Sequence, residues 1–307
     1  MRNAFFDELT KIFVKDEKVI FITGDLGYKL FDTLKEIDAE RVINVGIREA
    51  AMVGFAAGLA HKGFKPFIYS ITPFATLRCL EQIKIDLCYN KNKVVVVGIG
   101  GGYSYGPNGP THFGLEDVGV LNTFPNIHIL TPADPNEVVT CLRKIDSIKE
   151  PVYLRLGRNK EPCLYSNDIP ENISEPTRFA EGPDGTIICN GFILAEVLKA
   201  LPQLEELDIR PTVIQIRQFK PFPVVFLKKM LDKSKPVLTV EEHVAAGGLG
   251  SEVGKIILSQ HENRIPFSSL TAPDCYLEQC FDRDEALVWS NLDSNSIFKK
   301  FSELVNQ

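Results

Sequence analysis

The stretch from Val42 to Ala60 constrains the fold of this chain more than any other. It begins with β-branched residues, reaches Gly46, and about one turn later becomes a helical pattern of small and apolar residues. Open α/β sheets bind their ligands at such a strand-to-helix seam. Arg48 and Glu49 lie at this seam, so we expect them near a ligand site.

Glu49 is the candidate acid or base of this seam. A carboxylate at the mouth of a closely packed helix is poorly solvated, which favours a neutral or proton-sharing form that can protonate a ring nitrogen. The alternative is an ordinary acidic residue favoured by the helix dipole. The small residues between Ala50 and Ala60 leave little bulk on the helix, so we expect close packing against another element or another subunit.

Composition excludes several classes of protein. The 307 residues allow two domains at about 150 residues each, and 44% apolar residues suffice for buried cores. A net charge of -6 without a basic block argues against nucleic acid as a partner, so local arginines must hold any anionic substrate. The seven scattered cysteines form no CxxC pair, which argues against a disulfide framework or a zinc site. Neither a signal peptide nor a run of ~18 apolar residues is present, so we expect a soluble cytoplasmic protein without membrane contact.

The order of elements predicts two doubly wound α/β domains with mainly parallel sheets. Residues 1–160 form the first, with strands at 19–23, 42–45, 65–70, 93–98, 127–130 and 151–156 and with helices between them. Residues 161–184 are polar and proline-rich and are expected to form a linker. Residues 185–307 form the second domain, with strands at 186–191, 211–216 and 236–240.

The glycine-rich segment 98–106 leads to a candidate catalytic histidine. It does not match a dinucleotide fingerprint, because Tyr103 stands where the third glycine belongs and Pro107 follows in place of a helix. The segment is better interpreted as a loop at the end of a strand. His112 ends this loop beside the expected ligand edge and is a fair acid or base, although a lone histidine is more often structural.

Gly46-Ile-Arg-Glu-Ala-Ala-Met52 and the following Gly58-Leu-Ala60 resemble the pyrimidine-binding domain of transketolase and related thiamine diphosphate enzymes. The resemblance continues through Phe74-Ala-Thr-Leu-Arg78, Gly106-Pro-Asn-Gly-Pro-Thr-His112 and Glu241-Glu-His-Val-Ala-Ala-Gly-Gly-Leu-Gly250, and so covers nearly the whole chain. It implies a pyrimidine-binding domain followed by a transketolase C-terminal domain, whose work is mainly dimerisation.

The resemblance also implies roles toward the cofactor. Glu49 corresponds to the glutamate that hydrogen-bonds N1′ of the aminopyrimidine and drives formation of its reactive tautomer. Phe74 would stack on that ring. In Gly24-Asp-Leu26, Leu26 fits the aliphatic residue under the bend between the two rings. Asp25 beside it is a cofactor-binding candidate or a cap at the strand-to-turn transition.

Substrate contacts follow in the same way. His112 corresponds to the substrate-contacting histidine of transketolases and deoxyxylulose phosphate synthases, and Arg78 to a phosphate-contacting arginine of the synthases. Arg158 matches the phosphate arginine at the end of a strand, where a guanidinium can bind bidentately. Arg155 is a second candidate, or only a salt-bridge partner.

Three features remain open or depart from the family pattern. Asn108 stands where many relatives have aspartate, and a second histidine usually found upstream would fall near Gly100. Asn108 therefore implies a changed substrate, or a tolerated left-handed turn residue in its Asn-Gly context. Glu241-Glu-His243 with the following glycines could form a phosphate cradle, but the resemblance favours a subunit-interface loop.

The chain lacks the Gly-Asp-Gly motif through which the family holds the diphosphate and Mg²⁺, and Gly24-Asp-Leu26 is the nearest match. The resemblance therefore implies the C-terminal subunit of a split transketolase that uses thiamine diphosphate. It would work with an N-terminal partner that supplies the Mg²⁺ ligands, in an α2β2 assembly acting on sugar phosphates. The alternatives are a deoxyxylulose phosphate synthase-like or specialised sugar-pathway subunit, and a catalytically silent assembly subunit.

Overall fold

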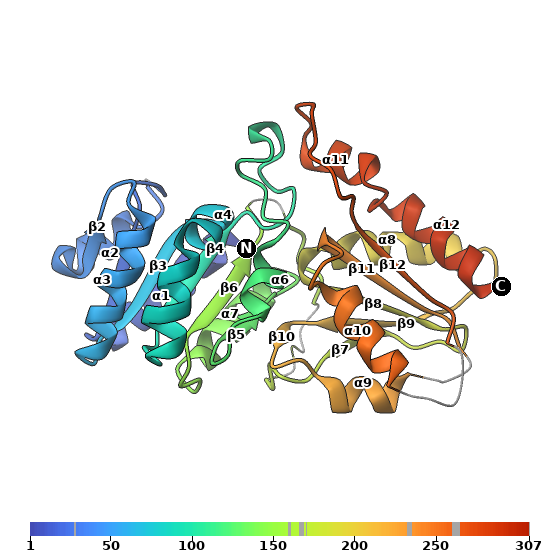
Figure 1. Ribbon diagram of the computed structural model, residues 1–307, viewed down its shortest axis with the longest axis horizontal. Helices are drawn as coiled ribbons and strands as arrows, with labels where there is room; N and C mark the ends of the chain where they lie inside the picture. The colour runs from blue at the N-terminus through green and yellow to red at the C-terminus, as the bar shows by residue number, and fades with distance from the viewer. Residues whose placement is uncertain are drawn as a thin grey trace.

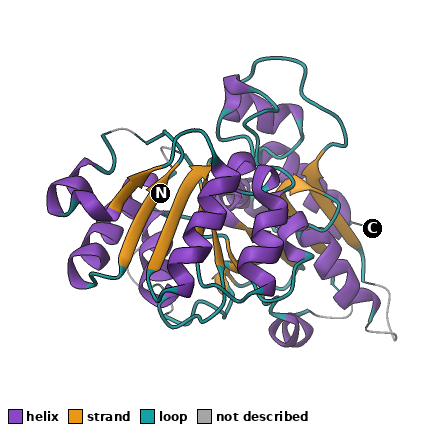
Figure 2. Cartoon of the chain, turned by 60° about the vertical axis from the view of Figure 1, so that its left-hand side comes forward, coloured by secondary structure: helices purple, strands orange, loops and turns teal. Residues whose placement is uncertain are grey.

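The computed structural model describes residues 1–27, 29–158, 161–165, 169, 171–231, 235–259 and 265–306. These residues form two α/β lobes that lie side by side, one from the earlier and one from the later part of the chain (Figure 1). Each lobe is built on a mainly parallel sheet with helices packed against its faces (Figure 2). The predicted fold class is confirmed.

The first sheet has the strand order β10-β5-β6-β4-β3-β1-β2, and only β10 runs antiparallel to its neighbour. Its strands are β1 (Val19–Thr23), β2 (Val42–Asn44), β3 (Lys65–Ile71), β4 (Val95–Ile99), β5 (His128–Leu130), β6 (Val152–Leu156) and β10 (Gln218–Lys220). Because β1 has β2 on one side and β3 on the other, the strand order reverses there. The crevice outside the carboxyl ends of the strands at such a reversal is the usual ligand site of open sheets.

Helices cover both faces of the first sheet. On one face, α1 (Arg2–Lys15), α2 (Asp32–Ile37) and α7 (Pro135–Ile145) share a buried apolar cluster with the strands. On the other face lie α3 (Glu49–His61), the π-helical segment Ile83–Tyr89 and α6 (Asp117–Asn122), preceded by the short α4 (Thr72–Ala75) and α5 (Leu80–Gln82). Helix α3 buries Met52, Val53 and Ala56 at helical spacing, so its packing stabilises the strand-to-helix seam predicted from the sequence.

The second sheet has the order β12-β11-β8-β9-β7, with only β7 antiparallel. Its strands are β7 (Thr177–Ala180), β8 (Thr186–Asn190), β9 (Thr212–Ile216), β11 (Val237–Val244) and β12 (Phe267–Ala272). The helices of this lobe are α8 (Leu194–Glu205), α9 (Val224–Met230), α10 (Leu249–Leu258), α11 (Arg283–Trp289) and α12 (Ser294–Val305).

Two short strands modify the predicted division at residues 160 and 184. Strand β7 lies inside the predicted linker 161–184 and pairs with β9. Its four residues carry too few apolar side chains to stand out in the sequence. Strand β10 belongs to the later part of the chain but joins the first sheet beside β5. One apolar cluster also runs along both sheets, so the lobes pack as neighbours. Residues 159, 160, 166–168 and 170, which belong to the predicted boundary and linker, lie outside the described residues.

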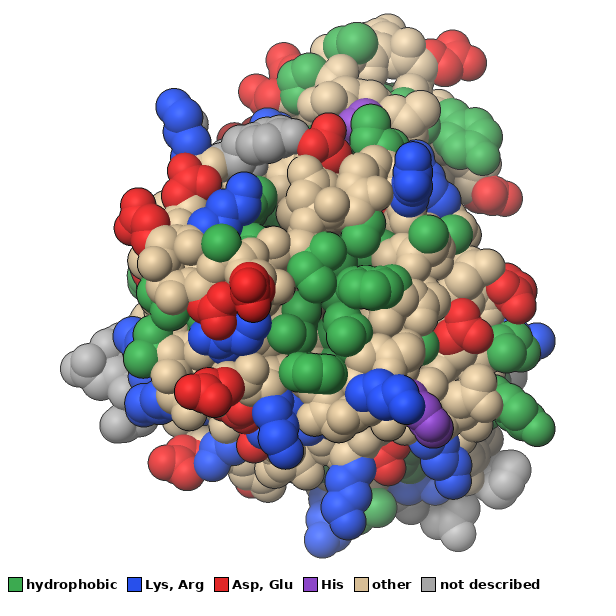
Figure 3. Space-filling view, turned by 90° about the vertical axis from the view of Figure 1, so that its left-hand side faces the viewer, with side chains coloured by type: hydrophobic (Ala, Val, Ile, Leu, Met, Phe, Trp, Pro, Cys, Tyr) green, Lys and Arg blue, Asp and Glu red, His purple; other side chains and the backbone are tan. Residues whose placement is uncertain are grey.

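Apolar side chains remain exposed around α3 and the helical segment that follows it. Ile47 is 74% exposed, Phe55 45% and Tyr89 75%. Figure 3 shows apolar side chains gathered near the centre of the left-hand side of the molecule as drawn in Figure 1, the side on which α2 and α3 lie. Single exposed apolar side chains are common in proteins, but a gathered group indicates an interaction surface.

Three further observations concern the cysteines, the length of the helices and the side chains that could bind a metal ion. All seven cysteines are free, and Cys79, Cys88, Cys141 and Cys189 are buried. Within the described ranges, no helix combines the length and the apolar character needed to cross a membrane. The same ranges contain no group of three or more His, Cys, Asp or Glu side chains placed to hold a metal ion.

Candidate active site

Glu49 opens helix α3 at the carboxyl edge of the first sheet, and only 2% of its surface is exposed. Ser70, in β3, donates a hydrogen bond to Oε1 at 3.4 Å, and Nη1 of Arg78 donates to Oε2 at 2.9 Å. A Cβ atom added to Gly24, directly after β1, would lie 3.4 Å from the Cγ atom of Glu49. The carboxylate therefore lies beside the ends of β1 and β3, where the strand order reverses.

Arg78 joins this carboxylate to an aromatic ring. Its Cζ atom lies 4.0 Å from the centroid of the Phe74 ring, while its Nη1 contacts Glu49. A planar group that carries N–H donors is thus held against a ring face and a buried carboxylate at the same time. An aminopyrimidine needs the same two features, an acceptor for its protonated nitrogen and a ring on which to stack, so the residues present fit such a ring.

His112 is on the loop between β4 and α6, and this loop rises above the first sheet (Figure 1). The side chain of His112 lies next to that of Phe74 in α4. The ring centroids of His112 and Phe74 are 5.1 Å apart, and the His112 ring lies 5.6 Å from that of Tyr105. Burial lowers the pKa of His112, and the positive charges of Arg158 and Arg78 lower it further. The imidazole is therefore neutral near pH 7 and can accept a proton.

Arg158 follows β6 and is held by an aromatic side chain. Its Cζ atom lies 4.5 Å from the centroid of the Tyr105 ring, and it makes no ion pair with any residue that the structure describes. It lines a cavity of about 380 Å³ whose other charged side chains are two cations, Lys199 and Arg283, and four carboxylates, Glu161, Glu196, Asp282 and Asp284. Because Arg158 forms no ion pair with any of these carboxylates, all of which the structure describes, its guanidinium can still bind an anion bidentately.

Four residues singled out from the sequence thus lie in one continuous series of contacts, namely Glu49, Arg78, Phe74 and His112, and Tyr105 extends the series to Arg158. Tyr105 belongs to the same series because it contacts both His112 and Arg158. Sequence reasoning missed Tyr105, since the segment 98–106 was interpreted only as a loop. The signal available was an aromatic residue a few positions before the candidate histidine.

Asp25 and Leu26 lie at the end of β1, directly after Gly24. Asp25 is exposed at φ 61°, its backbone N–H donates to Oδ1 of Asn44, and Nδ2 of Asn44 donates to its carboxylate, each at 3.0 Å. Leu26 is half-buried and packs against the core beneath the sheet. Both residues therefore lie at the carboxyl edge of the first sheet, directly after Gly24, which approaches Glu49. Asp25 serves the turn, and Leu26 packs against the apolar cluster shared with α1, α2 and α7.

Asn108 is exposed in the 3₁₀ turn Gly106–Asn108, and among the described residues its side chain has no hydrogen-bond partner. The left-handed position of this turn is Gly109, at φ 71°. Asn108 itself does not adopt the left-handed conformation, but it does lie in a turn, so the alternative of a tolerated turn residue stays open. Its side chain is free to contact a ligand above the loop.

Arg155 does not share the surroundings of Arg158. It is 3% exposed, and its Nε donates to Oδ2 of Asp117 at 2.8 Å. Its Nη2 donates to the backbone oxygens of Gly114 at 2.7 Å and Glu242 at 2.9 Å. A substrate phosphate could reach this guanidinium only by displacing buried partners, so the geometry favours the salt-bridge alternative.

The conceivable phosphate cradle after β11 is filled by the protein itself. Glu241 accepts hydrogen bonds from the backbone N–H groups of Leu249 at 2.6 Å and Gly250 at 2.9 Å, at the start of α10. Burial raises the pKa of Glu241 to about 7, although these two hydrogen bonds oppose the shift. Because a carboxylate occupies the helix N-terminus, no phosphate can bind there without displacing it.

The neighbouring Glu242 and His243 join the second lobe to the first, Glu242 at the loop that carries His112 and His243 at helix α6. Glu242 accepts a hydrogen bond from the backbone N–H of Tyr103 at 2.7 Å and pairs with Arg283 at 2.7 Å. His243 accepts a hydrogen bond at Nε2 from the backbone N–H of Gly119 at 3.0 Å. Sequence reasoning missed this role, because nothing in the motif shows which segment of the other lobe it meets.

Comparison with known proteins identifies the family of this chain. Residues 1–162 match the model of the transketolase pyrimidine-binding domain, and residues 177–297 match that of the transketolase C-terminal domain. One of the subunits of the apulose-4-phosphate transketolase of Phocaeicola vulgatus is 35% identical over 276 residues, which are 89% of this chain and 87% of the relative. The 1-deoxy-D-xylulose-5-phosphate synthase of Natranaerobius thermophilus is 31% identical over 97% of this chain but only 47% of that enzyme.

A solved structure described as a split gene transketolase, an inactive β4 tetramer, has the same fold. It superposes with a TM-score of 0.88 and 28% identity, and the match covers 99% of this chain and 98% of that one. The relatives therefore include separate transketolase subunits of which this chain covers nearly the whole length, beside a longer enzyme of which it covers about half.

Proposed function

The chain belongs to the transketolase family, and on that premise we propose that it is the C-terminal subunit of a split transketolase. With an N-terminal partner it transfers a two-carbon ketol unit from a ketose phosphate to an aldose acceptor. The support is the match over 87% of a relative that is named as a subunit of a transketolase, and over 98% of a structure named a split gene transketolase.

The observation that carries the proposal is the arrangement of Glu49, Arg78 and Phe74. A buried carboxylate and an aromatic ring already hold one planar N–H-bearing group between them. In the assembled enzyme, Glu49 and Phe74 would hold the aminopyrimidine of thiamine diphosphate, and Glu49 would hold or move the proton at its ring nitrogen. When bound, the cofactor supplies the nucleophilic carbon for the transfer. Leu26 and Asp25, directly after Gly24 at the same edge of the sheet, would contribute further contacts to the cofactor.

The substrate end of the site is formed by His112, Arg158, Asn108 and Tyr105. His112, neutral near pH 7, exchanges protons with substrate hydroxyl groups. Arg158 binds the phosphate of the sugar, because its guanidinium has no carboxylate partner in the described part of the chain. Arg78, once no longer paired with Glu49, would be free to contact the phosphate of the substrate. Asn108 meets the sugar from the loop above.

The N-terminal partner supplies the diphosphate site and the Mg²⁺ ligands in this proposal. Its contact surface includes the exposed apolar side chains of α3 and its surroundings, among them Ile47, Phe55 and Tyr89. Burying such side chains against a partner would stabilise the complex by about 25 cal/mol per Å² of apolar surface removed from water. The assembly is α2β2, with self-association of this chain.

A second candidate function is that of a deoxyxylulose phosphate synthase-like subunit. It is favoured by the relative from Natranaerobius thermophilus and by Arg78, which resembles a phosphate-contacting arginine of those synthases. The co-location of Glu49, Phe74 and His112 favours either enzyme over a silent assembly subunit, because a silent subunit has no need of an aligned site.

The proposal is tested by calorimetry with thiamine diphosphate and Mg²⁺, using this chain alone and this chain with the N-terminal partner. We expect useful affinity only for the pair. Micromolar binding by this chain alone would contradict the split architecture. Activity of the pair is then measured with ketose phosphates plus an aldose, and with pyruvate plus glyceraldehyde 3-phosphate. Turnover of the pyruvate mixture alone would favour the synthase alternative, and no turnover with any donor would favour the silent subunit.

A further inference from the structure

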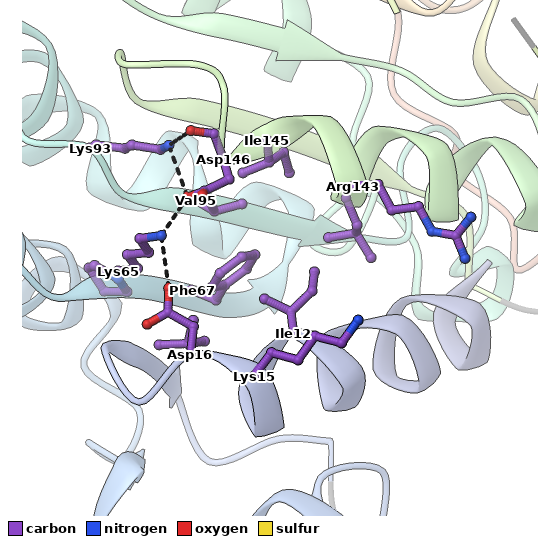
Figure 4. Close-up of a pocket in the computed structure, with 13 residues that line it drawn as sticks. Ile12, Lys15, Asp16, Lys65, Phe67, Lys93, Val95, Arg143, Ile145 and Asp146 are labelled. Carbon is purple, nitrogen blue, oxygen red and sulfur yellow. Dashed lines mark hydrogen bonds and ion pairs between the residues drawn. The ribbon is translucent and has the colours of Figure 1, made fainter. Parts of the chain in front are cut away.

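A cavity of about 220 Å³ lies at the amino-terminal edge of the first sheet, at the opposite end of the strands from Glu49. It opens to the surface between α1 and α7 and is bordered by the first residues of β1, β3 and β4 (Figure 4). Neither the active-site geometry nor the partner surface uses this region.

The floor of the cavity is apolar and the rim is charged. Phe67, Val95, Leu142 and Ile145 are each less than 5% exposed, and they form the surface between the two helices. Four cations and two carboxylates stand around it, a local positive surplus on a chain whose net charge is -6. The apolar floor and the cationic rim of the cavity together favour a ligand that has an apolar body and a negatively charged group.

The cations of the rim are not equally engaged. Lys65 pairs with both Asp16 at 2.8 Å and Asp146 at 2.7 Å, so it is fully used. Lys93 reaches a side-chain carboxylate only at 3.8 Å and donates to the backbone oxygen of Asp146. Lys15 lines the cavity and makes no ion pair with any residue in the described ranges. Figure 4 shows Lys15 on α1 and Arg143 on α7, on the side of the cavity away from the Lys65 pairs.

Arg143 also keeps hydrogen-bond donors that are free to bind an anion. Its Nε and Nη2 donate to Glu8 at 2.8 and 3.5 Å, while the side chain is 61% exposed. Its Nη1 has no protein partner among the described residues, and a guanidinium can serve two carboxylates at once. Even when Glu8 is counted with the rim, one positive charge remains in excess.

We propose that this cavity binds a small amphipathic anion, a single ring or short branched chain that carries one carboxylate. The apolar body lies on Phe67 and Val95 between the helices, and the carboxylate meets Lys15 and Arg143. The size follows from the volume, since a cavity of about 150 Å³ accepts benzene and ordinary ligand pockets begin at about 300 Å³. A ring with a short acidic tail fits about 220 Å³.

The test is a ligand-observed NMR titration of the full chain with 3-phenylpropionate and with its neutral analogue 3-phenylpropanol. We expect saturable binding of the acid at about 1 mM or below, which is the affinity of a ligand of this size at ordinary ligand efficiency. The alcohol should bind about tenfold more weakly. Added salt should weaken the binding of the acid but not that of the alcohol. No saturable binding of the acid, or equal binding of the two probes, would overturn the proposal.

Variants locate the binding. Lys15→Glu should lower the affinity for the acid about tenfold. Lys18→Glu changes the net charge equally, but Lys18 does not line the cavity, so this variant should leave the affinity unchanged. Ile12→Trp on the half-buried edge of α1 should fill the cavity and remove binding of both probes. Circular dichroism of each variant verifies folding. Equal affinity of the Lys15 and Lys18 variants would show that the acid binds elsewhere.

Discussion

Arg78 Nη1 lies 2.9 Å from Glu49 Oε2, so the arginine covers the carboxylate that the proposed cofactor must reach. The same guanidinium covers the face of the Phe74 ring at 4.0 Å. A cofactor ring entering this place must therefore displace Arg78. The displaced side chain, 44% exposed, has room to turn toward the substrate.

Removing the guanidinium should ease entry of the cofactor. For a half-exposed arginine, the ion pair and the contact with the ring together amount to about 1 kcal/mol. In the reconstituted complex we expect Arg78→Met to lower the Kd of thiamine diphosphate about fivefold and to raise the KM of the phosphorylated donor. Calorimetry measures the first and steady-state kinetics the second. Lys84→Met, an exposed lysine of the following segment, is the control, and an unchanged or weaker cofactor affinity would contradict the displacement.

Glu49→Gln should preserve assembly and slow turnover. The amide keeps the shape of the side chain and can still contact Arg78, but it cannot exchange a proton with a ring nitrogen. General acid–base groups contribute about 10² to 10⁴ in rate, and we expect a loss of kcat in that range. Size-exclusion chromatography checks assembly, and the exposed Glu40→Gln is the matched control. If the complex kept most of its activity, the proposed role of Glu49 would fail.

The titration of His112 can be measured directly by NMR on this chain. Burial and the charges of Arg158 and Arg78 hold its pKa below the ordinary value, so the ring stays neutral to a lower pH than a free histidine does. Arg158→Gln removes one of the repelling charges, so the imidazolium becomes easier to form and the pKa should rise. The His112→Asn spectrum assigns the signal. A pKa that stayed the same or fell would show that Arg158 does not act on this ring.

Asn108→Asp should change the choice of sugar. An amide donates and accepts hydrogen bonds without charge, whereas an ionised carboxylate only accepts. A buried polar group left without its partner costs about 1 to 3 kcal/mol, or about tenfold to a hundredfold in specificity. We expect the variant to raise kcat/KM for common ketose phosphates relative to the native donor. Asn291→Asp in the other lobe is the control, and unchanged ratios across a panel of sugar phosphates would make Asn108 a mere turn residue.

Glu241 should make the protein less stable as the pH rises. Its pKa is about 7 in the folded protein against 4.5 for an ordinary glutamate, so between these values the folded state keeps a proton that the unfolded state has lost. The free energy of unfolding therefore falls as pH rises through this window, by about 3 kcal/mol for this group. Glu241→Gln removes the titration, so urea unfolding of the variant should depend less on pH between about 4.5 and 7.

The exposed Glu278→Gln is the matched control for Glu241, since it alters the net charge equally without a buried site. Its unfolding should follow the unmodified protein at every pH. Equal slopes for all three proteins would show that Glu241 does not titrate in this window.

The sequence by itself was sufficient for the elements with strong local patterns. Strand β1 occurs at the predicted residues 19–23, because a run of apolar, largely β-branched residues is a local property. Helix α3 begins at Glu49 because the change from β-branched to small residues is also local. Short edge elements such as β7 and β10 were not predicted, since their few residues become strands only when a neighbouring strand offers its backbone.

For the site, sequence motifs identified Glu49, Phe74, His112, Arg78 and Arg158 without showing how they meet. Only the tertiary structure placed Arg78 across Glu49 and Phe74, buried Arg155 on Asp117, and inserted Tyr105 between His112 and Arg158. The physical reason is that residue type and spacing determine what a side chain can do, whereas its partners come from segments far apart in the chain. Which arginine is free to bind an anion is therefore decided by packing, through the carboxylates that the fold brings within reach.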